Sequence, residues 1–169
     1  NQYNSIGWLI GQTDVNGMIH SNEYDAVGRV LQTRLPDDTF YQYEYQNTYL
    51  YQVTDRAGRS TTFYRDILGR VTNQLDNATN SLVYRYDELG NVTNIVDPRG
   101  NVTAFEFDAE NRQTTKRFAD SSEYQYGYDA EGRLTSKLDA KGTTTYFNYD
   151  SVGNLTNINY STDHDVRFS

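Results

Sequence analysis

A phrase of eight residues recurs along this chain at a nearly constant interval of 21 residues. Its clearest copy runs from Tyr86 to Thr93, and related copies begin at Tyr24, Tyr128 and Tyr149. The second residue of the phrase, normally Asp, serves as a marker, and all intervals between markers are 21 residues except one of 20. A fixed period of this length predicts a repeat architecture. The eight marker positions are Asn4, Asp25, Gln46, Asp66, Asp87, Asp108, Asp129 and Asp150.

Each repeat contains two turn signals, about half a period apart. In most of them Asp is followed three positions later by Gly. The Asp side chain can accept a hydrogen bond from the backbone two residues on, and Gly can adopt a positive φ, so this pattern favours tight hairpin loops. Asn111 replaces Gly in one copy and is the next best residue for that conformation. The expected structural turn residues of the marker series are Asp25, Gly28, Asp66, Gly69, Asp87, Gly90, Asp129, Gly132, Asp150 and Gly153.

Between the turns, the side chains alternate with the two-residue period of a β-strand. Tyr84 and Tyr86 share one face of such a strand, and Arg85 occupies the other. No segment has a helical period. Because strand twist accumulates across a wide sheet, we predict an all-β fold in which about eight 21-residue β-hairpin units form a curved or spiralling antiparallel sheet. We expect residues 1–169 to be a single array, and a fragment of a longer repeat protein, since both ends fall within a predicted strand.

Tyrosine supplies the apolar surface that this polar chain otherwise lacks. The mean hydropathy is −0.83, and the chain contains 16 Tyr. A tyrosine ring can pack while its hydroxyl stays hydrated, which suits a thin sheet whose two faces are both moderately polar. The residue before the marker is aromatic in all copies but one, where Arg65 stands, and we expect these residues to form a stabilising ladder across the strands. The ladder residues are Tyr3, Tyr24, Tyr45, Tyr86, Phe107, Tyr128 and Tyr149.

Charge and composition exclude several classes of function. With 23 acidic and 15 basic residues the net charge is −8, which argues against nucleic acid and against anionic membrane surfaces as partners. The absence of cysteine excludes disulfides and thiolate metal sites. No apolar run approaches the ~18 residues of a membrane span. We therefore expect no cofactor, no nucleic-acid partner and no membrane span.

The repeated phrase Tyr-Asp-x-x-Gly-Arg/Asn-Val/Leu-Thr resembles the YD repeat of the RHS family, over essentially the whole chain. This family includes bacterial Rhs polymorphic toxins, cocoon-forming subunits of insecticidal toxin complexes, wall-associated proteins and animal teneurins. The resemblance implies a spiralling β-sheet that closes into a hollow shell, commonly around a toxic C-terminal segment. Gln46 and Arg65 depart from the phrase.

No residue pattern indicates catalysis or metal binding. The marker Asp residues could bind Ca²⁺, but such a site needs several carboxylates at one point, and turn capping explains a carboxylate repeated at every turn. The stretch from Asp97 to Gly100 resembles the Asp-Pro-x-Gly signature of a self-cleaving aspartyl site, yet it occupies a regular turn position. His20 and His164 are the only histidines, and no nucleophilic residue lies at a spacing from them that would indicate a catalytic pair. We predict no catalytic, metal or cofactor-binding residues and no enzyme activity.

Three functions fit these observations. The first is a structural β-sheet segment of a secreted or surface RHS-like protein, forming part of a hollow shell around a toxin-like cargo. The second is a cell-surface adhesion module in which exposed aromatic rings bind glycans or a cell-surface protein. The third is an extracellular filament that assembles end to end by strand pairing. The expected partners are further YD repeats of the same or a neighbouring chain and an enclosed toxin segment, and the expected location is secreted, extracellular or on the cell surface.

Overall fold

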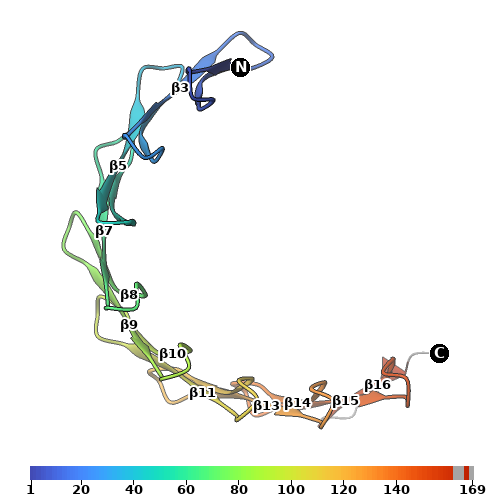
Figure 1. Cartoon of the computed structure of the whole chain (residues 1–169). Coiled ribbons are helices and arrows are strands. Elements are labelled where there is room, and N and C mark those ends of the chain that lie inside the picture. The colour runs from blue at the N-terminus through green and yellow to red at the C-terminus, as the bar shows by residue number, and fades with distance from the viewer. Residues whose placement is uncertain (162–165, 168–169) are drawn as a thin grey trace. The chain divides into compact units, whose positions relative to one another are not determined.

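The computed structural model describes residues 1–161 and the backbone of residues 166–167. In this part of the chain every regular element is a β-strand, which confirms the all-β prediction. The chain divides into two compact units, Asn1–Leu82 and Val83–Ser169. Figure 1 shows a succession of hairpins in each unit. The described residues include no helix with the length and hydropathy that a membrane span requires.

In the first unit, each strand pairs antiparallel with the next one along the chain. Most strands have five to seven residues, the length that the interval between turns predicts. The strands are β1 (Gln2–Tyr3), β2 (Leu9–Thr13), β3 (Ile19–Tyr24), β4 (Val30–Arg34), β5 (Phe40–Gln46), β6 (Tyr49–Thr54), β7 (Ser60–Arg65) and β8 (Val71–Asp76).

The second unit repeats this arrangement, beginning within β9 (Ser81–Tyr86). Consecutive strands are again antiparallel neighbours. The remaining strands are β10 (Val92–Val96), β11 (Val102–Phe107), β12 (Gln113–Arg117), β13 (Glu123–Tyr128), β14 (Leu134–Leu138), β15 (Thr144–Tyr149), β16 (Leu155–Tyr160) and β17 (Val166–Arg167).

The hairpin turns of each unit alternate between the two ends of the strands. We call those that begin at the marker positions the marker turns, and those between them, such as the turns at Asp55, Asp97 and Asp139, the opposite turns. Both kinds share one hydrogen-bond pattern: at Asp129, the N–H of Gly132 donates to the Asp129 carbonyl (3.0 Å), and the Asp129 N–H donates to the Arg133 carbonyl (3.0 Å). Gly132 has a φ of +83°, and Asn111, at the equivalent place one repeat earlier, has a φ of +68°.

The marker hairpins differ from the opposite hairpins by one extra residue. Tyr24 pairs with Val30 and Glu23 pairs with Gln32, so that Leu31 is bulged out of the ladder. The same shift follows the other marker turns, whereas the opposite hairpins keep a regular register. In the repeated phrase the bulged residue is Thr, and the Thr156 hydroxyl donates to the Asn148 carbonyl across the hairpin (3.0 Å). A bulge here increases the local twist of the strand pair.

The two faces of the second unit differ in character, so the prediction of two moderately polar faces is wrong for this unit. The strand register places most of its aromatic side chains on one face, which we call the aromatic face. On the other face Tyr146 is the single aromatic residue among the paired strand residues of 83–161. The aromatic face carries Tyr84, Tyr86, Phe105, Phe107, Tyr124, Tyr126, Tyr128, Phe147, Tyr149 and Tyr160.

Neither unit has a hydrophobic core of the usual kind. Among residues 1–161, no hydrophobic side chain is buried, while the polar side chain of Thr62 is only 8% exposed. The sheet is therefore a single layer within each unit, and its strands must be held together by ladder hydrogen bonds and by side-chain contacts along its surface.

Candidate functional site at the junctions between repeats

Each marker Asp bonds its own turn with both carboxylate oxygens. In the turn at Asp129, Oδ1 accepts the backbone N–H groups of Glu131 (3.1 Å) and Arg133 (2.8 Å). Oδ2 accepts the Nε–H of the Arg133 side chain (2.6 Å). Where the residue four positions on is Asn, its amide replaces the guanidinium, as from Asn154 to Asp150 (2.9 Å). The carboxylate thus caps the loop and orients the following side chain.

The turn residues expected from the sequence all lie in such loops. Asp25 and Asp66 accept the same bonds from Arg29 and Arg70. Asp87 accepts bonds from the backbone and side chain of Asn91. The glycines occupy the fourth turn position with positive φ: Gly28, Gly69, Gly90, Gly132 and Gly153. We propose that these residues stabilise the fold.

The capping bonds lower the pKa of the carboxylates that accept them. For Asp150 the amide of Asn154 is the largest cause, followed by the backbone N–H of Asn154. The pKa of Asp97 is lowered in the same way, first by the amide of Asn101 and then by its N–H. These groups favour the ionised carboxylate, because only that form accepts at both oxygens.

Acid is expected to destabilise the sheet. A carboxylate whose pKa is lowered in the folded chain contributes stability above its ordinary value of 3.8, and this contribution is lost as the pH falls through the folded pKa. The thermal midpoint, followed by circular dichroism, should stay nearly constant from about pH 7 to about pH 5 and fall below about pH 4. A midpoint that is unchanged at about pH 2 would contradict a stabilising role for the caps.

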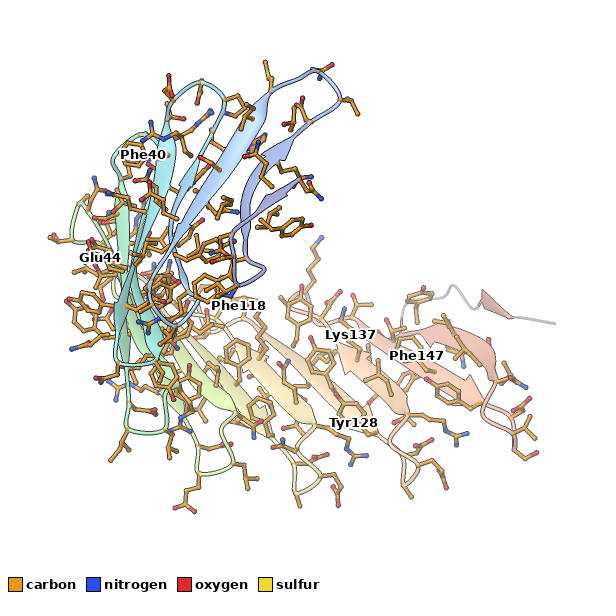
Figure 2. The ribbon with its side chains drawn as sticks, turned by 45° about the horizontal axis from the view of Figure 1, so that its top comes forward. Phe40, Glu44, Phe118, Tyr128, Lys137 and Phe147 are labelled. Atoms are coloured by element: carbon orange, nitrogen blue, oxygen red, sulfur yellow. The ribbon has the colours of Figure 1, made fainter. Side chains whose placement is uncertain are left out.

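The side chain four positions after the marker reaches the next repeat. The Arg133 guanidinium lies over the ring of Tyr149, 4.9 Å from its centroid, and Nη1 donates to the Asp150 carbonyl (3.4 Å). Arg112 makes the equivalent contacts with Tyr128 (4.8 Å) and with the Asp129 carbonyl (3.1 Å). One arginine therefore caps its own turn and packs on the ladder tyrosine of the following repeat. We call this contact between successive repeats a junction. Figure 2 labels Tyr128 in this row.

The ladder tyrosine in turn bonds back to the preceding repeat. The Tyr149 hydroxyl donates to the Leu134 carbonyl (2.9 Å), and the Tyr128 hydroxyl donates to the Gln113 carbonyl (2.9 Å). Tyr24 and Tyr45 make the same bond to the carbonyl fifteen positions earlier (2.7 and 3.0 Å). Each accepting carbonyl begins the strand that follows a marker turn, where the bulge interrupts the ladder.

Replacing Tyr128 with phenylalanine isolates this hydroxyl bond. The variant leaves the Gln113 carbonyl without its donor, and we expect a loss of about 1 kcal/mol in the free energy of unfolding. The matched control is Tyr146→Phe, on the other face, where the side chain is 48% exposed. That change should cost less than about 0.5 kcal/mol. Urea denaturation of both variants measures the difference, and equal costs would contradict the proposed role of the Tyr128 hydroxyl.

The most divergent repeat keeps the junction by exchanging its two partners. The hairpin register places Tyr49 where other repeats have arginine, and Arg65 where they have tyrosine. The Arg65 guanidinium lies 5.3 Å from the centroid of the Tyr49 ring, and its Nη1 donates to the Gly69 carbonyl (2.9 Å). Arg65, an apparent break in the sequence pattern, thus takes part in the same cation–π contact with the roles reversed.

Two further junctions use other side chains. Trp8 stands in the arginine position of the first repeat, and its ring packs on Tyr24 at 5.3 Å. At the junction with Phe107, the ladder residue that lacks a hydroxyl, Asn91 stands in the arginine position. The side-chain amide of Asn91 donates to the Asn111 side chain. Comparison of equivalent positions in successive repeats does not reveal these contacts. The arginine and tyrosine positions lie a constant sixteen residues apart, which is the signal for the contact between Trp8 and Tyr24.

The other candidates from the sequence lie apart from any such cluster. Asp97 accepts bonds from Arg99 and Asn101 in an opposite turn, so it is placed like any other turn Asp. His20 lines an open groove of about 420 Å³ beside the Asp37–Arg56 ion pair (3.7 Å). His164 lies outside the described residues. Within the described part of the chain, no group of three or more side chains is arranged to hold a metal ion.

A family model described as RHS Repeat matches the chain at three overlapping stretches, residues 86–123, 107–144 and 128–164. The stretches start one repeat apart, at Tyr86, Phe107 and Tyr128, which are three of the ladder residues. The match confirms the resemblance drawn from the repeated phrase. No curated protein matches the chain in sequence.

Several solved structures share the fold. A crystal structure of TcdB2-TccC3-Cdc42 matches 90% of the chain with a TM-score of 0.74 and 15% identity, and the match covers 9% of that structure's chain. A crystal structure of TcdB2-TccC3 matches 97% of the chain (TM-score 0.60, 14% identity, 12% of that chain). A structure of the Photorhabdus luminescens Tc holotoxin pore matches 98% (TM-score 0.55, 19% identity, 9% of that chain). The chain therefore spans about a tenth of the length of the chains it matches.

Proposed function

Because residues 86–164 of this chain match the RHS repeat, we propose that the chain forms part of the wall of a hollow protein shell that encloses a toxin-like cargo. The observation that supports this proposal most directly is the junction itself. Arg112 and Arg133 join successive repeats through one geometry, so a single-layered wall can extend without a core. The fold shared with TcdB2-TccC3 structures supports the same reading.

In this proposal the chain contributes structure and carries out no catalysis. Its partners are further repeats of the same kind, which extend the sheet, together with the enclosed segment. We further propose that residues 1–169 act as one array within a longer repeat protein that is secreted or displayed on a cell surface. A wall of this type isolates its contents from the surroundings, which is the mechanism of containment.

Electron microscopy of the intact protein from its natural source tests the proposal. Closed hollow particles are expected, together with a segment that resists added protease until the particle is opened by denaturant. Replacing Arg112 and Arg133 with alanine should make that segment sensitive to protease under native conditions, because two junctions are weakened. Long filaments with a regular axial repeat, or monomers without a protected segment, would overturn the shell.

A further inference from the structure

We propose that the aromatic face of the second unit docks an extended polypeptide in which a carboxylate recurs at every third residue, with uncharged residues between. This inference goes beyond the shell, because it assigns one face and the chemistry of its partner whether or not the sheet closes. The two faces of residues 83–161 differ in their aromatic and charged side chains. Figure 2 labels Tyr128, Lys137 and Phe147, which the strand register places on the aromatic face.

Two lysines lie among the rings of this face. Lys116 pairs in register with Phe105 and Tyr124, and its Nζ lies 4.8 Å from the ring centroid of Phe118 and 5.8 Å from that of Phe105. Lys137 pairs with Tyr126, and its Nζ lies 5.2 Å from the centroid of the Tyr124 ring. The rings hold both ammonium groups against the sheet surface, so the positive charges are fixed within an apolar surround.

The carboxylate of Asp139, in the turn that follows β14, interacts electrostatically with Lys137 without forming an ion pair. None of the paired strand residues that lie on the aromatic face within 83–161 is acidic. On the other face Arg117 is neutralised within the chain, because its Nε–H donates to Glu123 (2.9 Å). Neither Lys116 nor Lys137 forms an ion pair with a described residue. A partner that supplies carboxylates therefore complements this face and not the other.

The width of the aromatic face across the strands suits an extended ligand. Its rings span strands β9 to β16, and at ~4.8 Å per strand this surface is roughly 35 Å across. Lys116 and Lys137 lie two strands apart, a distance of roughly 10 Å. A polypeptide in the polyproline II conformation has three residues per turn and advances about 3.1 Å per residue, so carboxylates three residues apart lie on one side, about 9 Å apart, and can reach both lysines.

Other ligands fit this face less well. Two cations are too few for a polyanion such as single-stranded nucleic acid, whose affinity comes from many phosphate contacts. A neutral glycan can stack on the rings but supplies no negative charge to Lys116 and Lys137. The match in charge and in length thus favours an acidic polypeptide.

A fluorescein-labelled peptide of four Glu-Val-Thr triplets provides the test, with fluorescence anisotropy as the readout. It should bind the chain more tightly than the same peptide with Gln or Lys in place of Glu. Removing both charges by Lys116→Gln and Lys137→Gln should weaken binding about tenfold. The matched control removes two charges elsewhere, at Arg85 on the other face and at Lys141 on an opposite turn, and should change binding less than twofold.

Three results would overturn the inference. One is the absence of saturable binding of the Glu peptide, and another is equal weakening by the lysine pair and by the control pair. The third is tighter binding of a labelled oligonucleotide of the same length, which would assign the face to nucleic acid. Circular dichroism of each variant checks that the strands are intact, so that a loss of binding is not a loss of folding. None of these results depends on whether closed particles form.

Discussion

Replacing Gly28 with alanine is expected to lower the free energy of unfolding by about 3 kcal/mol. Gly28 has a φ of +90°, which strains any residue with a Cβ. An added Cβ would also lie 2.7 Å from Cζ2 of the Trp8 ring. The alanine must therefore displace the ring that packs on Tyr24, so the first junction is lost in addition to the backbone strain.

Gly58 serves to separate the effect of backbone strain from the effect of the contact with Trp8. Gly58 has a similar φ of +74°, and a Cβ built there meets no atom within 4 Å. Gly58→Ala should therefore cost only the backbone strain, about 1 kcal/mol. In a Trp8→Ala background, the cost of Gly28→Ala should fall to that of Gly58→Ala, as measured by urea denaturation. If the two alanine variants are equally destabilised in the natural background, the Trp8 contact does not contribute.

Swapping Tyr49 and Arg65 to the order found in the other repeats is expected to preserve the stability of the chain. Tyr49→Arg alone places two guanidinium groups together and should cost about 2 kcal/mol, through loss of the cation–π contact and through repulsion. The double variant Tyr49→Arg, Arg65→Tyr restores the order found in the other repeats. It also removes an orphaned group, because the Arg65 Nε is buried without a partner. Its stability should return to within about 0.5 kcal/mol of the natural chain.

A double-mutant cycle measures this coupling directly. Thermal or urea denaturation of both single variants and of the double variant gives the interaction energy, which should exceed about 1 kcal/mol in favour of the pair. Arg34 and Phe40 serve as a control pair, because the guanidinium lies 6.0 Å from the ring and on the other face of the same unit. Additive costs at Tyr49 and Arg65 would show that the exchanged pair is not a junction.

The strands and turns could be predicted from the sequence because their signals are local. Asp followed by Gly three positions later determines a loop by itself, and the alternation of Tyr84, Arg85 and Tyr86 determines a strand. The character of the faces could not be predicted in this way. Each marker hairpin contains a bulged residue, which reverses the alternation partway along the strand. Val92 and Ile95 consequently share a face although they are three residues apart, and a strict two-residue count separates them.

The junctions escaped prediction for a related reason. The contact between Arg133 and Tyr149 joins two repeats, and nothing in either repeat alone indicates it. Comparison of the repeats aligns tyrosine with tyrosine and arginine with arginine, whereas the contact joins the arginine of one repeat to the tyrosine of the next. The departures Tyr49 and Arg65 are explained only when the partner sixteen positions away is known, because the two residues change together. Trp8 is explained by its contact with Tyr24, which is the usual ladder residue.

The junctions described above act only between neighbouring repeats, which has a consequence for how such a chain can change its length. Inserting or deleting one whole 21-residue unit leaves the remaining contacts intact and creates a single new junction. The cation–π contact of the new junction can form wherever one of the two adjoining units supplies an arginine and the other a tyrosine. Gene duplication within the array can therefore lengthen or shorten the wall in steps of one hairpin, without redesign of the rest of the molecule.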